Sequence, residues 1–153
     1  MLYFAYGSNM SRALMNVRCP AARAIGPAML ESCRFVVTAD GYASAIPAPG
    51  CIVHGVLWRL TPRDLAALNI YENIGGGLYR SRVLTVRKNG WRLRALVYIT
   101  RPRGKGRPRP GYLELVVAAA RDWKFPDAYV RALERWAPSS FSAARAAESG
   151  ELA

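Results

Sequence analysis

The chain has few residues of the kinds that metal centres, histidine-based catalysis and disulfide scaffolds require. Its 153 residues include one histidine, His54, and three cysteines, Cys19, Cys33 and Cys51. A single imidazole excludes chemistry that needs two, and the cysteines lack the spacing typical of a metal site. Because their number is odd, we expect buried thiols in a reducing cytoplasm, and a packed rather than catalytic His54.

Long apolar stretches and acidic residues are also scarce. No run approaches the roughly 20 residues that cross a bilayer, and the N-terminus lacks the basic start, apolar stretch and cleavage site of a secretion signal. We therefore expect neither a membrane partner nor export. Ten acidic residues against 22 Lys and Arg give a net charge of +12. Such a chain attracts anions, whether small carboxylates, nucleic acid or acidic partners.

What the sequence does contain suits one globular domain. A chain with 52% hydrophobic and 21% charged residues is unlike a disordered protein and can build a core. Segments with strand periodicity surround one hairpin signal, with helical segments at the start, middle and end, so we predict an α+β domain. We assign residues 1–138 to this domain and residues 139–153 to a flexible C-terminal tail, because small and polar residues follow Pro138.

The clearest helix start follows the middle strand. Thr61 can cap the helix, Pro62 suits its first position, and Asp64 occupies the position of a capping-box acid. The helix should end near Glu72, because the glycine run at 75–77 cannot continue it. Glu72 would thus be held at the end of a rigid element.

Other elements follow from periodicity and turn signals. Asn89-Gly90 between two alternating segments predicts a hairpin whose second strand buries Trp91. Residues 41–50 hold three alanines and two prolines, and we predict a loop or an edge strand there. The low-complexity segment 101–110 (RPRGKGRPRP) is predicted to be an exposed loop that packs against nothing. Further strands are predicted at 2–6, at 24–30, where Gly26-Pro27 bends the strand, and at 34–38, which continues that strand or pairs with it. Strands are also predicted at 51–60, 78–86 and 91–100, and further helices at 11–17, 112–123 and 126–136.

The first ten residues combine a strand, a tight turn and a helix start. Apolar and aromatic residues at 2–6 predict a buried strand, which Gly7-Ser8-Asn9 then breaks. Such a turn gathers backbone N–H groups that can hold a carboxylate or a developing oxyanion. The alternative is a plain turn in which Ser8 or Asn9 caps the next helix.

Among the ten acidic residues, Glu72 has the surroundings that favour acid–base chemistry. Most of the others have the positions of solvated or capping helix residues. Glu72 lies between Tyr71 and the glycine run, in a segment of otherwise apolar or neutral residues. Partial burial there would raise the pKa of its carboxyl group and suit proton transfer. A surface glutamate that closes a helix is the alternative.

Two motifs resemble those of the γ-glutamylcyclotransferase family. Tyr-Gly-Ser-Asn after an aromatic strand is similar to the family's opening motif. The segment Leu68-Asn69-Ile70-Tyr71-Glu72, followed by the glycine run and Leu78-Tyr79-Arg80, resembles the part that carries its catalytic glutamate. The resemblance covers residues 2–136 and implies a small, mostly antiparallel β-barrel flanked by helices. One departure is Asn73, where the family often has glycine after the glutamate.

The resemblance also implies a reaction, which needs no cofactor. A γ-glutamyl amino acid or amine would cyclise to 5-oxoproline and release the free amine. Glu72 would be the general acid/base, and backbone N–H groups of the turn, helped by a tyrosine hydroxyl, would hold a substrate oxygen. The residues that the resemblance implies for substrate binding are Tyr3, Phe4, Ala5, Tyr6, Gly7, Ser8, Asn9, Tyr79 and Tyr112.

The sequence leaves the leaving group and the oligomeric state open, the latter between a monomer and a homodimer. One alternative function is a binding module that keeps the fold without catalysis. Another is nucleic-acid binding, because Lys105-Gly106-Arg107-Pro108 is close to the Arg-Gly-Arg-Pro core that lies in AT-rich minor grooves. That match is inexact and occurs once, so we expect a small-molecule γ-glutamyl substrate and no nucleic-acid partner.

Overall fold

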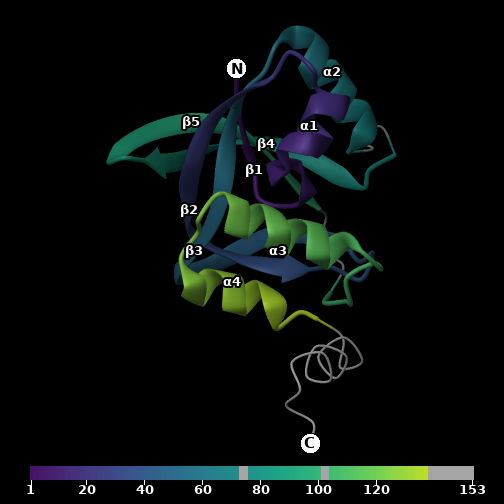
Figure 1. Ribbon diagram of the computed structural model, residues 1–153, viewed down its shortest axis with the longest axis vertical. Helices are drawn as coiled ribbons and strands as arrows, with labels where there is room; N and C mark the ends of the chain where they lie inside the picture. Colours follow the sequence, from purple (N-terminus) through teal and green to yellow (C-terminus); the bar gives the residue numbers. More distant parts are fainter. Residues whose placement is uncertain (73–75, 101–103, 138–153) are drawn as a thin grey trace, which may run out of the picture.

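The computed structural model describes residues 1–72, 76–100 and 104–137 (Figure 1). Its five strands close into a barrel in the order β1-β3-β2-β4-β5, so the predicted α+β barrel is confirmed. The predicted tail, 139–153, lies outside the described residues. The elements are β1 (Leu2–Ala5), the short 3₁₀-helix η1 (Ser8–Met10), α1 (Arg12–Arg18), β2 (Arg23–Val37), β3 (Ala43–Arg59), α2 (Pro62–Tyr71), β4 (Tyr79–Lys88), β5 (Trp91–Thr100), α3 (Tyr112–Asp122) and α4 (Asp127–Glu134).

The barrel is antiparallel except where its ends meet. β1 pairs antiparallel with β3 on one side and parallel with β5, at Tyr3 and Leu96, on the other. β2 pairs along most of its length with β3, and β4 pairs with β5. The short β1 is therefore held between two long strands, and the turn that follows it has a fixed position.

The helices cover the barrel in two pairs (Figure 1). α1 contacts α2, and α3 contacts both α4 and η1. α3 has an apolar stripe that faces the core, with Leu113, Val116 and Ala120 buried. No helix among residues 1–72, 76–100 and 104–137 is long and apolar enough to cross a membrane.

The local signals for α2 and for the β4–β5 hairpin are confirmed. The Asp64 N–H donates to Thr61 Oγ1 at 3.2 Å, and the Thr61 N–H donates to Asp64 Oδ2 at 3.0 Å, which forms the capping box. α2 ends at Tyr71, and Glu72 is its C-cap. In the hairpin, Asn89 (φ 50°) and Gly90 (φ 81°) both have the left-handed backbone conformation that a two-residue turn of this kind requires.

The prediction of a loop at 41–50 is wrong for most of that segment. β3 begins at Ala43, and this part pairs with the end of β2, with Ala45 opposite Phe35. Ala43 and Ala45 are buried, so their small side chains occupy core positions that allow neighbouring elements to approach closely. The alternative prediction of an edge strand is therefore closer to the structure. Alanine at these positions indicates tight packing within a strand, not the absence of one.

Two expectations about burial also fail. Trp91 is 73% exposed, because it lies at the tip of the β4–β5 hairpin, which projects from the barrel (Figure 1). Of the three cysteines only Cys19 is buried, and Cys33 and Cys51 are half-buried. His54 does pack, with its ring 4.6 Å from that of Tyr129.

The described part of the basic segment, residues 104–110, packs against the loop between β2 and β3, so the expectation that it contacts nothing is wrong. The Gly106 N–H donates to the Val37 carbonyl oxygen at 2.9 Å, and a Cβ at Gly106 would lie 2.2 Å from the Thr38 carbonyl oxygen. Arg109 Nε donates to the Asp40 carbonyl oxygen at 2.8 Å. Backbone hydrogen bonds and the Arg109 side chain together hold this segment, and side-chain composition does not predict these contacts.

Candidate active site

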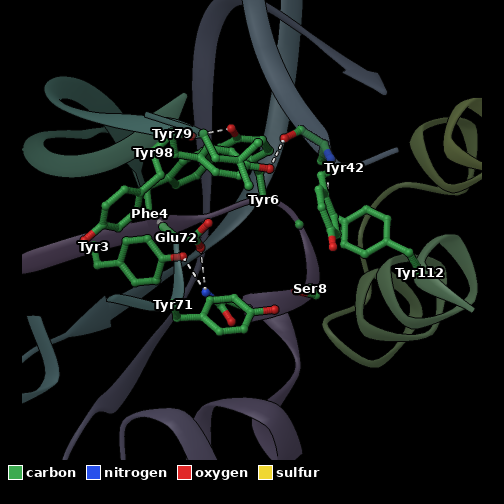
Figure 2. A pocket seen from close by; sticks show the side chains of 14 residues that line it. Tyr3, Phe4, Tyr6, Ser8, Tyr42, Tyr71, Glu72, Tyr79, Tyr98 and Tyr112 are labelled. Atoms are coloured by element: carbon green, nitrogen blue, oxygen red, sulfur yellow. Dashed lines mark hydrogen bonds between the residues drawn. The ribbon is translucent and has the colours of Figure 1, made fainter. Parts of the chain in front are cut away.

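One cavity opens beside the end of β1 (Figure 2). Its volume of about 140 Å³ is roughly ten times the 10–15 Å³ that a single water requires, so it can hold a small organic molecule. Figure 2 shows Glu72 near Tyr3 and Tyr71, with Tyr42 and Tyr112 on the opposite side. The lining residues are Tyr3, Phe4, Tyr6, Gly7, Ser8, Asn9, Tyr42, Ala43, Tyr71, Glu72, Leu78, Tyr79, Tyr98 and Tyr112.

The cavity brings together nine of the ten residues that the sequence and the resemblance single out, although the turn and Glu72 lie far apart in the sequence. Ala5 is the exception. It is buried within β1, and its carbonyl oxygen faces Gly55, where a Cβ would approach it to 2.5 Å. Ala5 therefore supports the strand instead of contacting a ligand in this cavity.

The turn after β1 is packed closely against the start of α3. A Cβ on Gly7 would lie 2.7 Å from the Tyr112 hydroxyl oxygen, so glycine is needed here for close approach and not for a special φ. The Ala43 N–H donates to the same oxygen at 3.2 Å, and the Ser8 backbone lowers the pKa of the Tyr112 hydroxyl, against the larger effect of burial. The Tyr112 hydroxyl thus reaches the backbone groups that we expected to bind a substrate oxygen.

Glu72 is presented by the end of α2. Its N–H donates to the Leu68 carbonyl oxygen at 2.7 Å, which fixes its backbone, and its Oε1 accepts from Asn9 Nδ2 at 3.2 Å. Burial raises the pKa of the Glu72 carboxyl group to about 7, against the opposing effect of the Arg18 guanidinium. A carboxyl group with this pKa can both accept and return a proton near neutral pH.

Asn9 connects Glu72 to the rest of the site. Its Nδ2 donates to the Tyr3 hydroxyl oxygen at 3.0 Å as well as to Glu72, and its Oδ1 accepts from Arg18. Asn9 is buried, and these contacts use both ends of its amide. The amide therefore has one orientation, with its nitrogen toward the carboxylate.

Arg18 lies behind the cavity wall at the last position of α1. It also donates to Ser8 Oγ at 3.3 Å, and its guanidinium lies 3.7 Å from the centroid of the Tyr71 ring. One side chain thus joins α1, the turn after β1 and the end of α2. The sequence gives no signal for this role, because an arginine at the end of a helix is commonplace.

The tyrosine hydroxyls of the cavity are mostly occupied by protein groups. Tyr79 donates to the Ala43 carbonyl oxygen at 2.7 Å, Tyr6 donates to the Tyr98 carbonyl oxygen, and Tyr98 donates to Asn69 Oδ1 at 2.6 Å. Burial raises the pKa of Tyr79 and of Tyr98 above the ordinary value. These hydroxyls stay protonated at neutral pH, so Glu72 is the group in the cavity suited to accept a proton.

Five lining residues were not predicted: Tyr42, Ala43, Tyr71, Leu78 and Tyr98. Tyr71 and Leu78 lie within motifs noted in the sequence, so their position could have been inferred. Tyr42 and Ala43 belong to the segment 41–50, for which the sequence predicts a loop or an edge strand and no part in a site. Within residues 1–72, 76–100 and 104–137, no group of three or more His, Cys, Asp or Glu side chains could hold a metal ion.

Comparison with known proteins gives consistent matches. Residues 3–125 match the family model described as gamma-glutamyl cyclotransferase, AIG2-like. Gamma-glutamylcyclotransferase of Homo sapiens is 24% identical over 152 residues, which cover 92% of this chain and 81% of the human protein. The Bos taurus protein of that name is 26% identical over 151 residues, covering 92% and 80%. A solved gamma-glutamyl cyclotransferase structure has the same fold, with a TM-score of 0.82 at 24% identity, covering 88% of this chain and 86% of that one.

Proposed function

Since the chain belongs to the gamma-glutamyl cyclotransferase, AIG2-like family and is an enzyme of the γ-glutamylcyclotransferase type, we propose that it cyclises γ-glutamyl amino acids or amines to 5-oxoproline, with Glu72 as general acid/base. One observation carries the assignment of the base. The Glu72 carboxyl group, with a pKa of about 7, shares a small cavity with the backbone turn of residues 6–9.

The proposed reaction is intramolecular. Glu72 accepts a proton from the α-ammonium group of the substrate, and the freed amine attacks the γ-carbonyl carbon. A C–N bond forms, the carbonyl oxygen becomes an oxyanion, and the original amide C–N bond then breaks. Glu72 returns its proton to the departing nitrogen. The attacking nitrogen then gives up a second proton, which also passes to the released amine, so the products are neutral 5-oxoproline and the amine as its ammonium ion, and no water is consumed.

The protein mainly has to impose a cyclising conformation and stabilise the developing charges. Backbone N–H groups of the turn at 6–9 would hold the oxyanion, and the Tyr112 hydroxyl lies next to them. Asn9 holds Oε1 of Glu72, which leaves Oε2 for the substrate's ammonium group. The aromatic rings that line the cavity would exclude water and favour a folded substrate.

The pKa of Glu72 leads to a prediction about pH. The carboxylate is the active form of the free enzyme, so kcat/KM should rise about tenfold per pH unit below pH 7 and level off above it. A base with the ordinary carboxyl pKa would instead give a flat profile between pH 6 and 7. The measurement is the initial rate of 5-oxoproline release between pH 5 and 8, in overlapping buffers of constant ionic strength. A profile that is level from pH 5 upward would contradict this environment for Glu72.

The function itself is tested with a panel of γ-glutamyl dipeptides and γ-glutamyl amines, by detecting 5-oxoproline and the released amine in equal amounts. Absence of turnover across the panel, with 5-oxoproline still binding, would favour a silent binding module. We do not advance nucleic-acid binding, because the segment that carries its motif, Lys105-Gly106-Arg107-Pro108, packs against the end of β2 and the loop that follows it. A short AT-rich duplex is the control ligand.

A further inference from the structure

Arg18 does not line the cavity, yet it contacts two parts of the cavity wall. Its guanidinium lies 3.7 Å from the centroid of the Tyr71 ring and donates to the side-chain oxygens of Ser8 and Asn9. The residue is half-buried, and no carboxylate of the described residues lies within ion-pairing distance of it. The position of the Arg18 guanidinium is therefore fixed, and no carboxylate of the described residues neutralises its positive charge through an ion pair.

We propose that Arg18 is a positioning residue for the reaction: it holds the Asn9 amide oxygen, turns the amide nitrogen toward Glu72, and thereby places its own positive charge one hydrogen-bonded residue away from the Glu72 carboxyl group. The proposal rests on the function proposed above for Glu72. It adds a residue that never touches the substrate but sets the orientation and charge of the general base.

The orientation argument follows from donor and acceptor chemistry. A guanidinium has only donors and an ionised carboxylate only acceptors, so an amide between them must turn its oxygen to Arg18 and its nitrogen to Glu72. The observed contacts have this arrangement, with Asn9 Nδ2 3.2 Å from Glu72 Oε1. Without Arg18 the amide could rotate, and its oxygen would then face the carboxylate and repel it.

The charge argument concerns every group that acts on the Glu72 carboxyl group. Burial raises its pKa, and Arg18 is the described cation that opposes this effect. Among the described residues, the other titratable groups that interact electrostatically with Glu72 come from β1, the turn, β4, β5 and α3. All of them are phenols that stay neutral near pH 7: Tyr3, Tyr6, Tyr79, Tyr98 and Tyr112. Asn9, which also touches the carboxylate, carries no charge. Without Arg18, no charge of the described residues would oppose the rise in the Glu72 pKa that burial causes.

The chain offers a matched control for a purely structural role. Arg12 lies on the same helix, and its guanidinium lies 3.8 Å from the centroid of the Trp123 ring, so it makes the same kind of stacking contact. Arg12 does not line the cavity, and it is not among the charges that shift the pKa of Glu72. If Arg18 acts only by tying α1 to its neighbours, Arg12→Met and Arg18→Met should have similar consequences.

The experiment compares Arg18→Met, Arg18→Lys and Arg12→Met with the wild type. An opposite charge nearby typically lowers a carboxyl pKa by about 1–3 units, so we expect Arg18→Met to raise the pKa of Glu72 by about one unit. The acid limb of kcat/KM should move to higher pH by the same amount, with at least a tenfold loss of kcat/KM near pH 6. Lysine keeps the charge but lacks the planar fork, so Arg18→Lys should retain the limb and still lose rate. Arg12→Met should change neither quantity.

Two further measurements keep the outcome interpretable. Carbon-13 NMR titration of the Glu72 carboxyl group reports its pKa without any turnover, so it separates this inference from the proposed function. A double-mutant cycle of Arg18→Met with Asn9→Ala tests whether Arg18 acts through Asn9, in which case the rate losses should not be additive. An unchanged Glu72 pKa in Arg18→Met would overturn the charge role, and additive losses in the double-mutant cycle would overturn the orientation role.

Discussion

Glu72→Gln should retain the fold and lose about a hundred- to ten-thousand-fold in the rate of 5-oxoproline formation, the usual effect of losing a positioned general base. Glutamine keeps the shape of the side chain, and its oxygen can still accept from Asn9, but it cannot take the proton from the substrate's α-ammonium group. That group is largely protonated at neutral pH, so the nucleophile becomes scarce. Binding should suffer far less, since backbone groups of the turn are expected to hold the substrate's oxygens.

The stability of the same variant provides an internal control. The pKa of Glu72 is about 7 in the folded protein against an ordinary 4.5, so between these values the folded state retains a proton that the unfolded state has lost. The wild type therefore loses stability as pH rises through this window, and glutamine does not. At pH 8 we expect Glu72→Gln to be more stable than the wild type by about 3 kcal/mol, and at pH 4 to be equal to it.

Both results are measured on the same preparations, by 5-oxoproline release and by urea unfolding at pH 4 and pH 8. A variant that matches the wild-type rate would show that Glu72 is not the base. A variant that is inactive and also much less stable than the wild type at both pH values would indicate a damaged fold. That result would contradict our account, in which ionisation of the buried Glu72 lowers the stability of the wild type.

Gly55→Ala should destabilise the fold by about 2 kcal/mol, within the range typical of overpacking in a core. Gly55 lies on β3 beside β1, and a Cβ there would approach both the Ala5 carbonyl oxygen and the Phe4 ring to 2.5 Å. One of these atoms belongs to the backbone, so a rotamer change cannot relieve the clash. β1 would have to move away from β3, and the turn at 6–9 would move with it.

Gly7→Ala is the matched comparison for this prediction. The atom that a Cβ at Gly7 would meet, at 2.7 Å, is the hydroxyl oxygen of Tyr112, at the end of a side chain that can shift. We therefore expect a smaller loss of stability at Gly7 but a loss of activity, because the displaced hydroxyl no longer accepts from Ala43. Urea midpoints of the two variants test the ranking. If Gly55→Ala unfolds at the wild-type midpoint, the close approach of β1 and β3 is not as described.

The parts of this fold that could be predicted from the sequence are those with strong local chemistry. The capping box of Thr61 and Asp64 specifies the start of α2, and Asn89-Gly90 specifies the hairpin, because each depends on residues only a few positions apart. Glu72 could be singled out as a candidate for acid–base chemistry for the same reason. The end of that helix and the apolar or neutral residues around Glu72 are both visible in the sequence.

The parts that could not be predicted depend on contacts between distant segments. Ala43 and Ala45 have little strand propensity, and only their pairing with β2 makes that segment a strand. The packing of residues 104–110 relies on backbone hydrogen bonds to Val37 and Gly41, which no side-chain pattern reveals. Arg18 contributes through two neighbours that become adjacent only when α1, the turn and α2 meet. Glu72 and most of the residues that line its cavity could be singled out from the sequence, whereas the contacts of Arg18 required the structure.

The most direct test of the central claim is the fate of the γ-carbonyl group when the protein acts on a γ-glutamyl dipeptide in ¹⁸O-enriched water. Attack by the substrate's own α-amino group gives unlabelled 5-oxoproline and one equivalent of the released amino acid, since no water enters the product. Mass spectrometry of both products distinguishes this from hydrolysis. We predict 5-oxoproline without ¹⁸O, formed by the wild type and barely by Glu72→Gln. Glutamate carrying ¹⁸O at its γ-carboxyl group would show that water is the nucleophile and would contradict the account.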